Sequence, residues 1–323
     1  MTENLSRRQM MTCTSVYLGA GVAAAVTGAA TAPAVAAAAQ DALQEPFRYC
    51  LNTGTLLGKK LPIVEEVQIA AQAGYQGIEP WVREIQQYVD QGGSLADLKK
   101  RIADRGLTVE GAIGFPSWCV DDEAKRIKGM EQFKREMDLV AQIGGLRIAA
   151  PPAGANKTPG MDLRKIAERY RDVLELGKQQ GLVAHLEIWG GSQTLSRISE
   201  AAYVAIESGH TDASLLLDCF HIYKSGCGFT GIRMLNGAAL HVFHINDYPA
   251  DPPREKATDA DRVFPGDGVA PLASILRDLR SIGFRGALSL ELFNREYWKQ
   301  DDGLTIAKTG LEKLRAAVRK AFA

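Results

Sequence analysis

The sequence predicts an α/β protein with a single-domain (β/α)8 barrel, the TIM-barrel fold. From residue 47 onward, eight short β-type runs alternate with longer amphipathic runs of helical period, mostly through short connections. Strands that alternate with helices form a parallel sheet, and eight such units in roughly 280 residues suit a closed barrel. A doubly wound open sheet is the alternative, but the sequence lacks the G-x-G-x-x-G and P-loop motifs of nucleotide-binding folds.

The predicted strands are short runs rich in apolar and β-branched residues. They cover residues 47–53, 77–81, 108–115, 147–151, 183–189, 214–220, 240–246 and 287–292. Amphipathic stretches follow them at residues 62–73, 95–105, 123–142, 162–180, 194–207, 231–236, 271–281 and 305–322. Gly74 and Gly106 directly follow the first two stretches, as expected where a left-handed residue ends a helix. The turn-rich segment 249–268 is long enough to be a functional or mobile loop.

Composition and charge exclude several classes of protein. The chain has 323 residues, of which 46% are hydrophobic and 24% are charged. These values fit a globular protein and exclude an intrinsically disordered or multi-span membrane protein. The 38 lysines and arginines balance the 38 aspartates and glutamates. Because binding to a phosphate backbone needs basic surface, nucleic acid is not the expected partner.

Residues 1–39 form a segment with its own composition and resemble a twin-arginine (Tat) signal peptide. Arg7 and Arg8 precede an apolar stretch at residues 16–35 that is mostly alanine and glycine, and small residues at 37–39 provide a cleavage site. A permanent membrane anchor is the alternative, but the stretch is only weakly apolar. We therefore expect export by the Tat route to a periplasmic or extracellular location, with no membrane span after processing.

Four cysteines follow the predicted leader, and no two of them form a C-x-x-C pair. They are Cys50, Cys119, Cys219 and Cys227. An oxidising compartment permits a disulfide, but the sequence does not determine a pairing. Cys50 and Cys219 fall within predicted strands and are expected to be small core residues.

Acidic and imidazole side chains gather where the last four predicted strands end. These side chains are Glu187, Asp218, His244 and Glu291. Chemistry in a (β/α)8 barrel occurs at the carboxyl ends of the strands, and side chains of alternate residues share one face, so the four are expected to converge. Buried carboxylates require a counter-charge. Three carboxylates and one imidazole suit Mn²⁺, Mg²⁺ or Co²⁺ better than a closed structural zinc site.

On these residues the sequence resembles the xylose-isomerase-like barrels of sugar isomerases and epimerases, which include ketose 3-epimerases and inosose dehydratase. The resemblance covers about residues 47–322, within a domain assigned to residues 40–323. It is carried by Leu186-Glu187, Asp218-Cys219-Phe220-His221, His244-Ile245-Asn246-Asp247, Pro265-Gly266-Asp267-Gly268 and Leu290-Glu291. It implies one divalent metal bound by the four convergent residues, and it implies that His221 contacts substrate. An arginine of the loop after His244 also contacts substrate in the family, and Arg254 is the candidate here.

Several further residues are candidates for the substrate pocket. Glu79 ends the second strand, Trp189 ends the fifth, and Asn246 shares a strand face with His244. Phe115 and Trp118, at the end of the third strand, are expected to join Trp189 in an apolar wall against a sugar face.

The predicted reaction is proton abstraction α to a carbonyl of a free sugar or cyclitol, through an enediolate, with Glu187 and Glu291 transferring the proton. Family epimerases carry a glutamate six residues after the fifth-strand ligand, where this chain has Gln193. A metal-dependent lyase or dehydratase that acts by β-elimination on 3-keto-glycosides or inososes is therefore the alternative. A non-catalytic sugar-binding barrel is a further alternative.

A homo-oligomer is compatible with each of these three functions. The related endonuclease IV nucleases bind three zinc ions and need more than the five histidines present.

Overall fold

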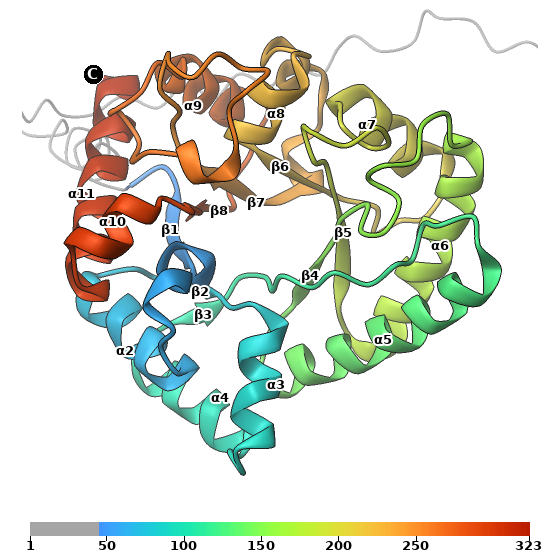
Figure 1. Ribbon diagram of the computed structural model, residues 1–323, viewed down its shortest axis with the longest axis horizontal. Helices are drawn as coiled ribbons and strands as arrows, with labels where there is room; N and C mark the ends of the chain where they lie inside the picture. Colours follow the sequence, from blue (N-terminus) through green and yellow to red (C-terminus); the bar gives the residue numbers. More distant parts are fainter. Residues whose placement is uncertain (1–44) are drawn as a thin grey trace, which may run out of the picture. The chain divides into compact units, whose positions relative to one another are not determined.

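The computed structural model describes residues 45–323, in which eight parallel strands curl into a barrel surrounded by helices (Figure 1). The strand order is β3-β2-β1-β8-β7-β6-β5-β4. The strands are β1 (Arg48–Asn52), β2 (Gly77–Glu79), β3 (Thr108–Val109), β4 (Arg147–Ala150), β5 (Val183–Glu187), β6 (Leu215–Asp218), β7 (Leu240–Ile245) and β8 (Ala287–Leu290). The predicted (β/α)8 barrel is thus confirmed. The predicted leader, residues 1–39, lies outside the described residues.

Ten α-helices occur in residues 45–323. They are α2 (Ile63–Ala73), α3 (Val82–Asp90), α4 (Leu95–Asp104), α5 (Glu123–Gln142), α6 (Leu163–Gln180), α7 (Ile198–Glu207), α8 (Cys219–Ser225), α9 (Leu272–Ser281), α10 (Arg295–Gln300) and α11 (Gly303–Phe322). Four 3₁₀ helices complete the set: η1 (Thr53–Lys59), η2 (Thr230–Met234), η3 (Gly237–Ala239) and η4 (Asp259–Asp261). No helix of the described part is long and apolar enough to cross a membrane.

The helices differ from the sequence prediction in four places. α3, α8 and α10 are additional, and they are short helices that follow the ends of β2, β6 and β8. The stretch predicted at residues 231–236 is instead largely the 3₁₀ helix η2. Short helices of this kind are fixed by tertiary contacts more than by an amphipathic period.

The main hydrophobic core lies between the barrel wall and the helices, whereas the barrel interior is largely polar. Buried apolar side chains from the strands and surrounding helices form one large cluster. Inside the barrel, a small cluster of Ile113, Ala149, Leu216 and Val242 is separate from it. Cys50 and Cys219 are fully buried, as predicted, and all four cysteines of residues 45–323 are free.

The two edge strands of the sheet, β3 and β4, meet at a junction with few hydrogen bonds, which we call the seam. β3 and β4 stand at opposite ends of the strand order, and the amide of Ala149 donates to the carbonyl of Ala112, just beyond β3, at 2.9 Å. By contrast, β5 to β8 are consecutive neighbours, with Asp218 level with His244 and His244 level with Ser289. This register places the predicted ligands on adjacent strands.

Two buried carboxyl groups, Glu66 of α2 and Glu84 of α3, interact behind the barrel wall. Thr53 Oγ1 donates to Glu84 Oε2 at 2.5 Å, and the amide of Trp81 donates to the same oxygen at 3.1 Å. Glu66 Oε2 has no partner within residues 45–323. Burial, and to a smaller extent the nearby Glu84 carboxylate, raises the pKa of Glu66 from 4.5 to about 9.

We expect the free energy of unfolding to fall as the pH rises from about 4.5 to about 9, because the folded protein keeps a proton on Glu66 that the unfolded chain releases. Glu66→Gln should remove this pH dependence and raise the free energy of unfolding at pH 8. Each kcal/mol of added unfolding free energy raises Tm by about 2–4 °C. Little change is expected at pH 4.5. Calorimetry at both pH values checks this, with Glu65→Gln, an exposed neighbour on α2, as the matched control. Identical pH profiles for the two variants would contradict it.

Candidate active site

Four buried side chains converge where β5 to β8 end. Glu187 is the last residue of β5, Asp218 is the last residue of β6, His244 lies in β7, and Glu291 directly follows β8. Each is at most 4% exposed. The convergence predicted from strand alternation is therefore present in the structure.

Three of the four are arranged to hold one metal ion. Asp218, His244 and Glu291 offer ligand atoms that all lie within 4.8 Å of one another. His244 Nδ1 lies 3.3 Å from Glu291 Oε2 and 3.8 Å from Asp218 Oδ2. Glu187 is outside this group, although it lines the same cavity, and its Oε2 has no hydrogen-bond partner in the described chain. Two carboxylates, one imidazole and a nearby orphaned carboxylate oxygen fit a divalent cation.

Arg262 supplies the positive charge of the site. Its Nη1 donates to Asp218 Oδ2 at 2.9 Å and to Glu291 Oε2 at 2.7 Å. Its Nη2 lies 2.6 Å from Asp259 Oδ1 and 3.3 Å from His221 Nε2. The side chain is 1% exposed. A buried guanidinium in contact with three carboxylates offsets much of their mutual repulsion.

The arginine of this loop that reaches the site is not the one predicted. Arg254 is exposed, pairs with Glu255 at 2.8 Å and does not line the cavity. Arg262 lies where the returning loop meets the sheet, because Val263 forms an antiparallel bridge with Asp247. The apolar pair Val263-Phe264 after Arg262 was the available signal, since it indicates a buried, extended segment rather than an open loop.

The two glutamates have opposite acid–base properties. Burial raises the pKa of Glu187 to about 8, against the opposing effect of the His244 imidazole. Burial acts to raise the pKa of Glu291 as well. The His244 imidazole and, to a smaller extent, the Arg262 guanidinium nevertheless hold this pKa well below its usual range. A pair of carboxyl groups driven apart in this way provides one group that holds a proton near neutral pH and one that is ionised and free to accept a proton.

The cavity above these residues has a charged wall and an aromatic wall. Its volume is about 390 Å³. Trp81, Phe115, Trp189 and Phe293 form the aromatic wall, with ring centroids 5.0 Å apart for Trp81 and Phe115 and 6.0 Å apart for Phe115 and Trp189. The charged and imidazole groups of the lining come from Glu187, His221, Asp259, Arg262 and Glu291. Such a cavity suits a small ligand that presents one apolar and one oxygen-rich face.

Trp189 and His221 thus line the cavity as predicted. Trp118 does not, because it is fully buried and its indole N–H donates to the carbonyl of Pro151 at 2.7 Å. Asn246 lies below the cavity, where its Nδ2 donates to Asp218 Oδ2 at 3.1 Å. Glu79 is likewise outside the cavity and contacts His244 Nε2 at 2.9 Å.

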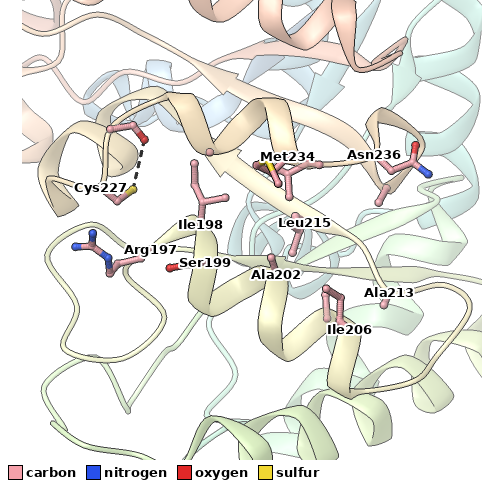
Figure 2. Close-up of a pocket in the computed structure, with 15 residues that line it drawn as sticks. Arg197, Ile198, Ser199, Ala202, Ile206, Ala213, Leu215, Cys227, Met234 and Asn236 are labelled. Atoms are coloured by element: carbon pink, nitrogen blue, oxygen red, sulfur yellow. Dashed lines mark hydrogen bonds between the residues drawn. The ribbon is translucent and has the colours of Figure 1, made fainter.

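A second pocket, of about 590 Å³, lies outside the barrel beside α7 and η2. Figure 2 shows Ile198, Ala202 and Ile206 of α7 on one side of it and Met234 on the other. Its lining is mainly apolar and includes no carboxylate or imidazole. It therefore offers no set of carboxylates and imidazoles like that at the mouth of the barrel, and the mouth of the barrel is the candidate active site.

Comparisons with known proteins identify the family of the chain. A family model described as "Xylose isomerase-like TIM barrel" matches residues 67–317. Inosose isomerase of Bacillus velezensis is 28% identical, over 85% of this chain and 98% of that protein. L-ribulose 3-epimerase of Mesorhizobium japonicum is 28% identical, over 64% of this chain and 68% of that protein. 3-Dehydroshikimate dehydratase of Pseudomonas aeruginosa is 26% identical, over 71% of this chain and 36% of that protein.

A solved structure shows the same fold. The IolI protein, determined with a bound zinc atom, superposes with a TM-score of 0.78 at 24% identity, over 86% of this chain and all of that one.

We expect Mn²⁺ to bind the chelator-treated protein and to raise its Tm, because a ligand that binds only the folded state stabilises it. Asp218→Asn should weaken Mn²⁺ binding at least about tenfold, because it removes a ligand charge. Asp259→Asn is the matched control, since it also removes a carboxylate that contacts Arg262 but lies outside the three-residue group. Calorimetric titration checks both variants, and equal losses would contradict the assignment.

Proposed function

Since the chain belongs to the xylose isomerase-like TIM barrel family, we propose that it is a divalent-metal-dependent sugar isomerase or epimerase acting by proton abstraction α to a carbonyl. The observation that carries this proposal is geometric: the carboxyl groups of Glu187 and Glu291 line one cavity, and Glu291 lies beside Asp218 and His244. Relatives named as isomerase, epimerase and dehydratase support the same general chemistry.

Asp218, His244 and Glu291 would hold the metal, with Glu187, which lines the cavity together with Glu291, as a further ligand. The bound cation would supply Lewis-acid polarisation of the substrate carbonyl. The oxygen-rich donors support Mn²⁺, Mg²⁺ or Co²⁺, and the zinc in the similar IolI structure adds Zn²⁺ to the ions to be tested.

The remaining steps fall to side chains of this protein. Glu187 and Glu291 remove the proton from carbon and return it, on either side of the substrate plane. Arg262 and His221 face the same cavity and stabilise negative charge that develops on the substrate oxygens in the enediolate. The aromatic wall covers the apolar face of the sugar and excludes water.

A lyase acting by β-elimination on a 3-keto-glycoside or an inosose is the second candidate. Gln193 stands where family epimerases carry a further glutamate, and it does not line the cavity. An aromatic wall would also accommodate an aromatic leaving group. The complete set of charged side chains argues against a non-catalytic sugar-binding barrel, which would have no need to retain it.

We expect the wild-type enzyme loaded with Mn²⁺ to exchange a substrate C–H for deuterium in D₂O, in a panel of ketohexoses, inososes and 3-keto-glucosides. Glu187→Gln and Glu291→Gln should each slow exchange by at least about 100-fold, because each removes a proton-transfer group. Glu110→Gln, a buried carboxyl that does not line the cavity, is the control. Mass spectrometry detects the label.

The product distinguishes the two candidates. Deuterium in an isomeric sugar supports an isomerase or epimerase, whereas release of water or aglycone supports a lyase. Full exchange in both glutamine variants would contradict the proposed roles of Glu187 and Glu291, and a metal-loaded protein without exchange on any substrate would favour the binding protein.

We also propose that the protein is exported by the Tat route to the periplasm or the exterior. The support is the Arg7-Arg8 pair before a weakly apolar, alanine-rich stretch. Replacing both arginines by lysine should leave the full-length precursor inside the cell, whereas Gln9→Ala should not. Cell fractionation and N-terminal sequencing check this, with the exported chain expected to begin near residue 40. Undiminished export of the double lysine variant would contradict the Tat route.

A further inference from the structure

The carboxylate of Glu79 lies in the barrel interior directly behind His244. It is fully buried, and its Oε2 accepts hydrogen bonds from three other strands. The donors are Asn52 Nδ2 of β1 at 3.0 Å, His244 Nε2 of β7 at 2.9 Å and Ser289 Oγ of β8 at 2.8 Å. A carboxylate held by three donors has a fixed position and gives a fixed direction to each of them.

This contact determines which nitrogen of His244 faces the candidate metal ligands. A carboxylate only accepts hydrogen bonds, so Nε2 must carry a hydrogen toward Glu79. Nδ1 is then the nitrogen on the opposite side, 3.3 Å from Glu291 Oε2 and 3.8 Å from Asp218 Oδ2. With its hydrogen held on Nε2, a neutral imidazole presents the lone pair of Nδ1 to these oxygens.

Asn52 holds Glu79 in turn, because both ends of its amide group are engaged. Its Nδ2 donates to Glu79, while its Oδ1 accepts from the amide of Gly54 at 2.8 Å and from Trp81 Nε1 at 3.0 Å. The amide orientation is therefore determined by its partners, and Glu79 cannot turn away from His244 without losing a buried hydrogen bond.

From this arrangement we infer that Glu79 is a positioning residue for metal binding: it keeps the hydrogen of His244 on Nε2 and directs Nδ1 at the ion. This inference rests on the proposed function, which places a metal beside His244. It replaces the role of substrate contact predicted for Glu79, whose side chain does not line the cavity. An outer carboxylate that orients a histidine ligand commonly changes metal affinity by about 10–100-fold.

The first test is the affinity for Mn²⁺, measured by calorimetric titration of the purified wild type and four variants. Glu79→Met removes the acceptor at similar volume and should raise Kd about 10–100-fold, and Glu79→Gln should give a smaller rise. Ser289→Ala removes another donor to the same oxygen but leaves His244 in contact, so its Kd should stay within about threefold. Glu110→Gln, which removes a buried carboxyl elsewhere in the barrel, should also leave Kd unchanged.

The second test needs no metal. In protein labelled with ¹⁵N in the histidine rings, the Nε2–H of His244 should be a slowly exchanging resonance in the wild type. It is identified by its absence in His244→Gln. It should be lost or exchange rapidly in Glu79→Met, while the resonances of the other histidines are unchanged.

The outcomes separate this inference from the proposed function. A wild type that binds Mn²⁺ while both Glu79 variants bind equally well overturns the inference and leaves the proposed function standing. A wild type that binds no divalent ion removes the metal from the proposed function and overturns the role in metal binding, and the resonance then shows only whether Glu79 holds the ring. An Nε2–H that remains protected in Glu79→Met overturns the inference in either case. If Glu79→Met does not fold by circular dichroism, Glu79→Gln decides by the same criteria.

Discussion

The mouth of the barrel depends on the neutralisation of four carboxyl groups buried in one place. Glu79, Glu187, Asp218 and Glu291 are each at most 4% exposed, and such groups are costly to bury without compensation. The structure compensates Glu79, Asp218 and Glu291 with the guanidinium of Arg262, the imidazole of His244 and a set of neutral donors, whereas burial raises the pKa of Glu187 toward its neutral form. The polar interior of the barrel is organised around this requirement.

The loop between β7 and α9 places Arg262 in the candidate site. Asp247 anchors it, because one carboxylate oxygen accepts from the amides of Tyr248 and Ala270 at 2.8 Å and the other accepts from Gly266 at 3.0 Å. Gly268 passes so close to this anchor that a Cβ would lie 2.2 Å from the carbonyl oxygen of Tyr248. The P-G-D-G segment is therefore a structural support for an arginine that precedes it.

The sequence sufficed for the fold and for the convergence of four residues, but not for the contacts that loops create. Strand alternation placed Glu187, Asp218, His244 and Glu291 at one mouth, because period and strand order depend only on local pattern. The prediction of Arg254 is wrong because a loop has no period that indicates which side chain turns inward. Similarly, the end of a strand gives the position of Glu79 or Trp118 along the chain but not whether the side chain meets the cavity, a neighbouring strand or the core.

The seam between β3 and β4 has a consequence for the motions of the barrel. Any sheet that closes on itself opens most easily where the fewest ladder hydrogen bonds must break, and here that point is the junction of Ala112 with Ala149. The strands that bear Glu187, Asp218 and His244, and β8 directly before Glu291, pair in sequence away from this junction, with one register shift between β6 and β7. The weakest point of the closed sheet therefore lies apart from Asp218, His244 and Glu291, the three residues that could hold a metal ion.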